Sequence, residues 1–299
     1  MRETIALSRP SGQPRITIVA PAHDEQDNIA RLVDEVERAG GTLARALGGD
    51  TDEFEFVIVD DGSTDETRGR AAALARTRPW LRVIALERTP PGRGNGQSAA
   101  FHAGFRAARA PLIAVLDADL QNDPADLPGM LDVMRRERAD LVQGDRSANR
   151  RDNLIRRINS RIGRLFRGLI LGDTIRDTGC SLRIMKREVA LALPLEFRGM
   201  HRFIPVTARQ LGFKVVETSV RHRARNAGQT KYGLGIVQRA IPGLIDCFAV
   251  RWMRGRRRPV EAIEVPVDES GPTPPIGRQQ EAPAPVVLVR PGAREGAHA

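Results

Sequence analysis

The stretch Val115-Leu116-Asp117-Ala118-Asp119-Leu120-Gln121-Asn122-Asp123-Pro124 decides how this chain folds. It continues a short apolar run, 112–116, and then places two aspartates two residues apart. On a β-strand this spacing puts both side chains on one face, and at the carboxyl end of a buried strand that face opens into a crevice. Two carboxylates held there repel each other and lose hydration unless a cation lies between them. Oxygen ligands of this kind suit Mg²⁺ or Mn²⁺, so Asp117 and Asp119 are candidate metal ligands.

An isolated Asp-x-Asp has a simpler interpretation, in which the acids are solvated or cap a helix that starts at Asp123-Pro124. Two other expected strands end in the same way. Residues 54–61 finish in two aspartates, where Asp61 or Ser63 could cap a helix from near Thr64. Residues 15–20 run into Pro21-Ala22-His23-Asp24-Glu25. Capping explains each cluster separately, but a parallel sheet would bring all three to one edge, where ligands bind.

Hydrophobic periodicity predicts alternating strands and helices over the first half of the chain. This alternation favours an α/β fold with a mostly parallel sheet and helices on both faces. The expected strands are 15–20, 54–60, 81–86, 112–116 and 140–144, and the expected helices are 28–39, 64–76, 96–109 and 126–138.

Two basic amphipathic helices are expected after residue 144, at 152–172 and 233–254. Each combines an apolar stripe with bordering arginines, and the second ends in Arg-Trp-Met-Arg-Gly-Arg-Arg-Arg. Such helices are typical of membrane surfaces or acidic partners, and the alternative is a helix packed on the domain with a solvated arginine face. Charges interrupt both, and no uncharged stretch reaches the roughly 18–20 apolar residues that span a bilayer. We expect a peripheral, surface-lying protein, with a separate membrane protein as a further candidate partner.

Charge is distributed very unevenly along the chain. Residues 1–144 carry 18 Arg and Lys against 23 Asp and Glu, whereas residues 145–258 carry 26 against 8, a net charge of +18. An acidic half followed by a basic half suggests two phosphate-bearing ligands, one held through a cation and one by arginine directly. Arginine suits a phosphate because of its bidentate fork. The candidates for the second ligand are Arg146, and Arg156 with Ser160 one helical turn later.

The cysteines and the two ends of the chain carry less information. Cys180 and Cys247 show no metal-type spacing, so a reduced, cytosolic setting is expected. Residues 1–14 lack the apolar core of a signal peptide, and 255–299 hold eight of the twenty prolines without periodicity. Both ends are expected to be disordered.

Seven segments, taken in order, resemble the GT-A-fold glycosyltransferases of family 2, and within it the polyprenol-phosphate sugar transferases that include dolichyl-phosphate mannosyltransferase. One departure is Asp24, where many members have Asn. The segments are Pro21-Ala22-His23-Asp24-Glu25, Val59-Asp60-Asp61-Gly62-Ser63, Asn95-Gly96-Gln97-Ser98-Ala99-Ala100, Asp117-Ala118-Asp119-Leu120-Gln121, Gly144-Asp145-Arg146, Asp177-Thr178-Gly179-Cys180-Ser181-Leu182-Arg183, and 223–232.

The resemblance implies an inverting transfer of a sugar from a GDP- or UDP-linked donor to a polyprenyl phosphate at the cytoplasmic face of the membrane. It implies a GT-A domain over 15–232, with 15–144 as the nucleotide-sugar half and 145–232 as the acceptor half. Asp117 and Asp119, with Gln121, would hold Mg²⁺ or Mn²⁺, and Arg146 would join them in catalysis. The implied donor-binding residues are Pro21, His23, Glu25, Ile58, Asp60, Asp61 and Ala118, together with Arg225 and Lys231 on a loop, 222–232, that would close over the phosphates.

Two alternatives remain at this stage. A family 2 transferase with a soluble or polysaccharide acceptor would keep the donor chemistry but would need a general base to deprotonate a hydroxyl. It would have less reason for two basic amphipathic helices. A nucleic-acid-binding protein would explain the +18 half. It leaves the three acidic strand ends unexplained, and one Tyr, two Trp and nine Phe offer little for base stacking.

Overall fold

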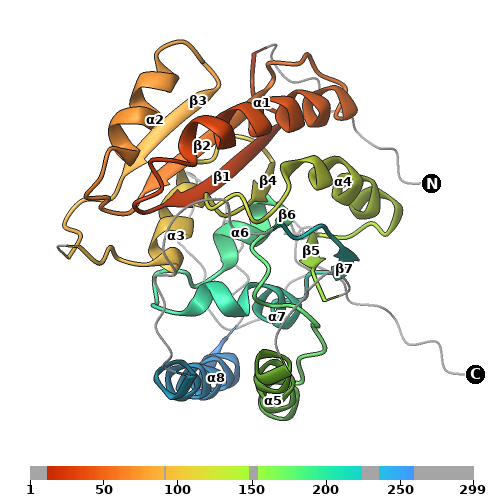
Figure 1. Cartoon of the computed structure of the whole chain (residues 1–299). Coiled ribbons are helices and arrows are strands. Elements are labelled where there is room, and N and C mark those ends of the chain that lie inside the picture. The colour runs from red at the N-terminus through yellow and green to blue at the C-terminus, as the bar shows by residue number, and fades with distance from the viewer. Residues whose placement is uncertain (1–11, 91, 148–153, 224–235, 259–299) are drawn as a thin grey trace, which may run out of the picture.

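The structure is a computed structural model that describes residues 12–90, 92–147, 154–223 and 236–258 (Figure 1). Most of the two ends expected to be disordered, and residues 224–232 of the predicted loop 222–232, lie outside the described residues. Side chains are described from residue 163 onward in the helix that begins at 154, and from residue 242 onward in the helix that begins at 236.

The described part of the chain forms one seven-stranded sheet in the order β3-β2-β1-β4-β6-β5-β7. Strand β6 runs antiparallel to both of its neighbours, and the other pairs of adjacent strands are parallel, as expected for a mostly parallel sheet. The five strands predicted from the sequence are present, whereas β6 and β7 were missed. The bounds are β1 Ile16–Ala22, β2 Phe54–Asp60, β3 Leu81–Ala85, β4 Leu112–Val115, β5 Leu141–Asp145, β6 Arg183–Lys186 and β7 Val215–Ser219.

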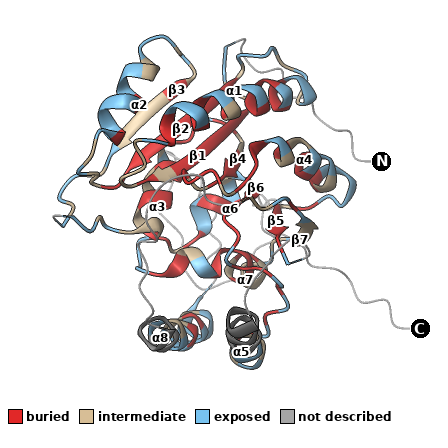
Figure 2. Cartoon of the chain, in the orientation of Figure 1, coloured by how far each residue is buried: buried red, intermediate tan, exposed pale blue. Residues whose placement is uncertain are grey.

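Alternate side chains of the central strands pack into two separate cores, one on each face of the sheet. Ile16 and Ile18 of β1 enter the first core, and Val19 enters the second. Burial on both faces explains why these strands read as continuous apolar runs. Helices α1 (Ile29–Ala46), α2 (Thr67–Ala75) and α4 (Leu127–Arg136) supply the first core, as Figure 2 shows by burial.

The second face is covered by helices from both halves of the chain. Helix α3 packs there beside the elements that follow β6, and its Phe101 and Phe105 rings stack with centroids 5.6 Å apart. The sequence reading missed the short elements after β6. The bounds are α3 Gln97–Ala107, α6 Arg187–Ala192, the 3₁₀ turn η2 Met200–Phe203 and α7 Ile204–Gln210, while a further 3₁₀ turn, η1 Pro124–Asp126, lies on the first face.

The two predicted amphipathic helices are α5 (Leu154–Leu171) and α8 (Ile236–Arg256), which contact each other at the far end of the second face (Figure 1). Cys247 and Val250 anchor α8 in the second core. No helix in the described residues is long and apolar enough to cross a membrane. Among the described side chains of the two helices, seven large apolar ones are exposed: Leu165, Phe166 and Leu169 on α5, and Leu244, Ile245, Phe248 and Trp252 on α8.

Candidate active site

The three acidic strand ends meet at one edge of the sheet, as the sequence predicts. Strands β1, β2 and β4 are adjacent and parallel, with Ala22 opposite Asp60 and Val19 opposite Val115. The chain then leaves all three strands in the same direction. This carboxyl edge of the sheet therefore gathers residues 21–25, 60–63 and 117–121 around one place.

Asp117 lies just beyond β4 and is held by two neutral donors. The Gln97 side-chain amide donates to its Oδ1 at 2.7 Å, and Ser181 is a second side-chain hydrogen-bond partner. Burial, followed by the nearby charge of Asp119, raises the pKa of Asp117 to about 6. Both causes disfavour the ionised form, so a cation at this carboxylate would remove an electrostatic penalty.

Asp119 is 9% exposed and turns the chain away from the strand. Its Oδ1 accepts a hydrogen bond from the backbone N–H of Gln121 at 3.1 Å, and Leu120 between them has a φ of 60°. The Gln121 carbonyl oxygen accepts from the backbone N–H of Arg223 at 2.9 Å. The described start of the predicted loop 222–232 therefore runs beside the Asp119 turn.

The two carboxylates fit a divalent metal of the Mg²⁺ or Mn²⁺ kind. In the described part of the chain no group of three or more His, Cys, Asp or Glu side chains could by itself hold a metal ion. Mg²⁺ commonly binds through one or two carboxylates and completes its coordination with water and substrate phosphates. Asp117 and Asp119 would supply two carboxylate ligands of this kind, and the remaining coordination positions of the metal would be left to water and a diphosphate.

Metal binding should weaken in acid because Asp117 must be ionised to bind a cation. Since the pKa of Asp117 is raised to about 6, its protonated fraction becomes dominant below that pH. We expect the dissociation constant for Mn²⁺ to rise about tenfold for each pH unit below 6 and to level off above 7. Titration of the protein with Mn²⁺ between pH 4.5 and 8, followed by electron paramagnetic resonance, measures this. A dissociation constant that is flat down to pH 4.5 would contradict the raised pKa.

Asp60 and Asp61 are both buried and both already bonded. Asp60 pairs with Arg68 of α2 at 2.7 Å and accepts from the Ser63 backbone N–H. Asp61 accepts from the backbone N–H groups of Asn95 and Gly96 at 2.7 and 2.6 Å, which fixes the loop before α3. The expectation that Asp61 or Ser63 caps the next helix is wrong. That helix begins at Thr67, and its first N–H groups are served by Asp65, whose Oδ1 accepts from the Thr67 N–H at 2.9 Å.

The acidic segment after β1, residues 21–25, is held by side-chain contacts against the acidic segment after β2, which begins at Asp61. Asp24 has a φ of 51°, and its carboxylate accepts from the backbone N–H of Thr64 at 2.7 Å. Asn and Asp both tolerate this left-handed conformation and both supply the acceptor, which explains why Asp replaces the usual Asn here. His23 Nδ1 contacts the Asp61 carbonyl oxygen at 2.9 Å, and Glu25 accepts from the Asn28 amide at 2.7 Å.

The side chains of three predicted donor-binding residues are buried or partly buried. Ile58 is fully buried and Ala118 is 2% exposed, and both side chains belong to the first core. Pro21 is partly buried near the end of β1. Ile58 and Ala118 remain predicted donor-binding residues, with side chains that lie in the first core.

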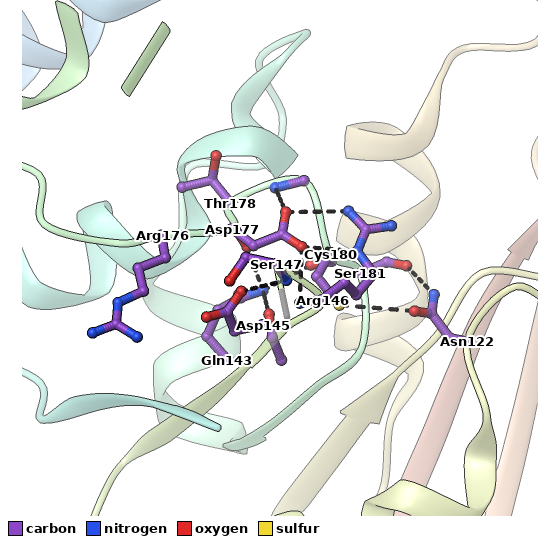
Figure 3. Close-up of polar contacts among 12 residues, drawn as sticks. Asn122, Gln143, Asp145, Arg146, Ser147, Arg176, Asp177, Thr178, Cys180 and Ser181 are labelled. Carbon is purple, nitrogen blue, oxygen red and sulfur yellow. Dashed lines mark hydrogen bonds and ion pairs between the residues drawn. The ribbon is translucent and has the colours of Figure 1, made fainter. Parts of the chain in front are cut away.

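Arg146 forms a buried ion pair with Asp177 (Figure 3). Its Nε donates to Asp177 Oδ2 at 2.8 Å and its Nη2 donates to Oδ1 at 3.1 Å. The fork predicted to hold an acceptor phosphate is thus occupied by a carboxylate of the chain itself. Burial alone would lower the pKa of the Arg146 guanidinium, but the hydrogen bond and charge of Asp177 outweigh it and raise that pKa. The pair links the residue that follows β5 to the segment that precedes β6, and α5 lies in the connection between these two strands.

The structure reveals a second buried arginine that sequence reasoning did not single out. Arg183 is 3% exposed, with its Nε donating to Gln143 Oε1 at 2.6 Å and its Nη2 to the Thr178 carbonyl at 3.2 Å. Burial lowers its pKa to about 10, and its charge favours the ionised form of Asp117. Its place beside Asp117 follows from the pairing of Val115 with Arg183, which requires the missed antiparallel strand β6.

Four predicted site residues are not described. Arg225 and Lys231 lie outside the described residues, and the side chains of Arg156 and Ser160 do so as well. The backbone of α5 includes positions 156 and 160, so their expected helical setting is confirmed.

Comparison with known proteins agrees with this geometry. The family model described as "Glycosyl transferase family 2" matches residues 17–193, which is more than half of the chain. The chain belongs to glycosyl transferase family 2. This family 2 glycosyltransferase is 34% identical over 267 residues to a dodecaprenyl-phosphate galacturonate synthase of Rhizobium johnstonii, covering 87% of this chain and 74% of the relative. It is 32% identical over 240 residues to an undecaprenyl-phosphate 4-deoxy-4-formamido-L-arabinose transferase of Yersinia pestis, covering 80% and 69%.

Solved structures of low sequence identity share the fold. A glucosyl-3-phosphoglycerate synthase of Mycobacterium tuberculosis, in complex with Mn²⁺, UDP and phosphoglyceric acid, aligns with a TM-score of 0.56 at 19% identity, covering 83% of this chain and 80% of that one. A mannosyltransferase of Pyrobaculum calidifontis, in complex with GDP-mannose and Mn²⁺, aligns with a TM-score of 0.53 at 17% identity, covering 85% and 70%. The predicted GT-A fold of this family 2 glycosyltransferase is thereby confirmed.

Proposed function

We propose that this glycosyltransferase moves a sugar from a nucleotide sugar to a polyprenyl phosphate. The observation that carries the proposal is the Asp117–Asp119 pair at the carboxyl edge shared by three parallel strands, because it suits a metal-bound diphosphate. The names of the two relatives, both polyprenyl-phosphate sugar enzymes, support the choice of acceptor. The Mn²⁺ in the complexes of the two structural neighbours supports a divalent metal.

The transfer requires no side chain that acts as a general base on the acceptor. A lipid monophosphate has a second pKa of about 6, so near neutral pH its oxygen is already a nucleophile. That oxygen attacks the anomeric carbon, the bond from this carbon to the diphosphate oxygen breaks, and the nucleoside diphosphate leaves with the bonding electrons. A bound divalent cation supplies charge stabilisation to the leaving diphosphate. Asp117 and Asp119 hold it, with Gln121 as a third oxygen ligand.

The other predicted residues take positions around this centre. Residues 21–25 and 60–61 face the nucleoside, whose N–H and O–H groups suit acidic partners. Arg156 and Ser160 on α5 bind the acceptor phosphate together with the charge of Arg146, and Arg225 and Lys231 reach the donor phosphates. The catalytic domain spans 15–232, its halves divide between 144 and 145, and α8, predicted from the sequence as 233–254, is the membrane-surface helix.

The exposed apolar side chains of α5 and α8 support a peripheral attachment at the inner face of the membrane. Phe248 is 56% exposed, Trp252 64% and Leu169 72%, and arginines follow them at the end of α8. Such a face can sink ~5–10 Å into the headgroup boundary while the arginines meet anionic lipid. The alternative of an ordinary packed helix leaves these side chains in water.

Binding to vesicles should depend on both the apolar face and the charge. Each basic residue near an anionic surface contributes about 1 kcal/mol. Replacing Arg254, Arg257 and Arg258 by Ser should therefore weaken co-sedimentation with anionic liposomes by on the order of 100-fold. Phe248→Ser with Trp252→Ser should weaken it as well, and high salt should reduce the binding of the unchanged protein.

A matched control removes three exposed arginines on elements of the first face, Arg38, Arg76 and Arg136, and should leave vesicle binding almost unchanged. Equal losses of vesicle binding in the two triple-arginine variants would show that the net charge of the protein, and not the arginines at the end of α8, attracts it to the vesicles. Absence of binding to any liposome would overturn direct membrane attachment and favour docking onto a separate membrane protein.

The acceptor class is tested by comparing three acceptors with one panel of nucleotide sugars. The protein with Mn²⁺ should glycosylate a polyprenyl phosphate but neither the same polyprenyl chain ending in a free hydroxyl nor a soluble oligosaccharide. A hydroxyl acceptor would need a general base to deprotonate it, whereas the phosphate acceptor is already ionised. Faster transfer to the oligosaccharide than to the lipid phosphate would instead establish the alternative of a soluble or polysaccharide acceptor.

A further inference from the structure

Asp117 is oriented by a network of neutral side chains that reaches it from two separate elements. Gln97 approaches from the first turn of α3, and Ser181 approaches from the turn before β6. Neither residue carries charge, and neither is among the residues predicted to bind donor, acceptor or metal. Their shared target is one of the two carboxylates that the proposed function assigns to the metal.

In the contact between Gln97 and Asp117, Gln97 is the hydrogen-bond donor. An ionised carboxylate only accepts hydrogen bonds, so the amide must present its NH₂ group to Asp117 Oδ1. The turn that carries Gln97 is itself fixed at the next residue. Ser98 Oγ lies 2.9 Å from His201 Nδ1 and accepts from the His201 backbone N–H at 3.1 Å. Residue 97 therefore has little freedom to move away from Asp117.

Ser181 is itself held in place by Asn122 (Figure 3). Asn122 Nδ2 donates to Ser181 Oγ at 2.8 Å, which leaves the Ser181 hydroxyl hydrogen free to point to Asp117. Asn122 Oδ1 in turn faces Cys180 Sγ at 3.7 Å, which fixes which end of the amide meets the serine. Asn122 is 1% exposed and Ser181 3% exposed, so water competes little with these bonds.

We propose that Gln97 and Ser181 are positioning residues that hold the Asp117 carboxylate in its metal-binding orientation. The inference rests on the proposed function, because it takes Asp117 to be a metal ligand. Gln97 occupies a lone pair of Oδ1, so the carboxylate cannot rotate freely, and its remaining lone pairs would be available to hold the cation. Partners that orient a ligand in this way typically change metal affinity or activity by about 10–100-fold when they are removed.

The test is Mn²⁺ binding to the full chain, measured by electron paramagnetic resonance in the presence of UDP or GDP, beside the thermal midpoint of unfolding. Gln97→Ala and Ser181→Ala should each weaken Mn²⁺ binding by about 10–100-fold. Excess Mn²⁺ should restore turnover in both variants, because the ligand remains present. Matched controls are Gln210→Ala on α7, whose Nε2 has no hydrogen-bond partner among the described residues, and the exposed Ser219→Ala on β7. Both controls should bind Mn²⁺ as the unchanged protein does.

Different failures separate the inference from the proposed function. If Asp117→Asn abolishes Mn²⁺ binding while Gln97→Ala and Ser181→Ala keep full affinity, the positioning role is overturned and the metal site stands. Lower thermal midpoints with unchanged Mn²⁺ affinity would assign the two residues to the fold alone and overturn the inference. If neither the unchanged protein nor Asp117→Asn binds Mn²⁺, Asp117 is not a metal ligand. The inference, which depends on that assignment, is then overturned as well.

Discussion

Replacing Asp117 or Asp119 by Asn should reduce sugar transfer by about a thousandfold. A bound divalent cation supplies several kcal/mol of charge stabilisation to a leaving diphosphate, and each 1.4 kcal/mol or so is a factor of ten in rate. Asn keeps the shape of the side chain but removes the charge that holds the cation. The measurement is turnover with saturating nucleotide sugar and polyprenyl phosphate, with Mn²⁺ or Mg²⁺ added.

The control for this prediction is Asp132→Asn, which removes one exposed carboxylate from α4. That variant should retain full turnover, and a chelator in excess should stop the unchanged protein as completely as either substitution does. Turnover that persists in excess chelator would contradict the assignment of Asp117 and Asp119 to a required metal ion, even if both Asn variants were inactive.

Breaking the Arg146–Asp177 pair should destabilise the fold by about 3–5 kcal/mol, because removing one partner leaves an uncompensated buried charge. The two side chains are 9% and 7% exposed and share two hydrogen bonds. Arg146→Met and Asp177→Leu should each show this loss in the free energy of unfolding by denaturant. The double variant should lose much less than the sum of the two, because no unpaired charge remains in it.

An exposed pair provides the comparison. Lys186 and Glu188 lie 3.8 Å apart with side chains 46% and 64% exposed, so Glu188→Gln should change stability by no more than about 1 kcal/mol. If Arg146→Met lost activity with an unchanged free energy of unfolding, Arg146 would act on substrate alone, and the buried pair would not be the structural element described above.

The sequence was sufficient for the elements that carry strong periodicity. Strands β1, β2 and β4 are mostly apolar and acids stand at or just after their carboxyl ends, so a mostly parallel sheet with a shared edge could be predicted. Strand β6 was missed because its four residues, Arg-Ile-Met-Lys, are short and half basic. Strand β7 was missed because it is half exposed. Both take their strand form from neighbours in the sheet, which a single sequence does not show.

The same limit applies to the site. Asp117 and Asp119 are neighbours in sequence, so the sequence alone predicts that they lie close together, although both follow the end of β4 and do not share a strand face. Gln97 and Ser181 reach Asp117 from 20 residues before it and from beyond α5, so the contacts exist only once the sheet has formed. For Arg146 the sequence did not show a partner that the structure places beside it. Its charge and position suggested a phosphate ligand, but the carboxylate that occupies its fork, Asp177, lies 31 residues further along the chain.

The most direct test of the account is the identity of the two products formed from a nucleotide sugar and a polyprenyl phosphate. Mass spectrometry of the lipid and chromatography of the nucleotide measure both in one reaction with Mn²⁺. Attack on the anomeric carbon predicts a lipid with one phosphate between polyprenyl chain and sugar, and one nucleoside diphosphate released for each sugar transferred. A lipid diphosphate sugar with release of nucleoside monophosphate, or no glycosylated lipid with any donor, would contradict it.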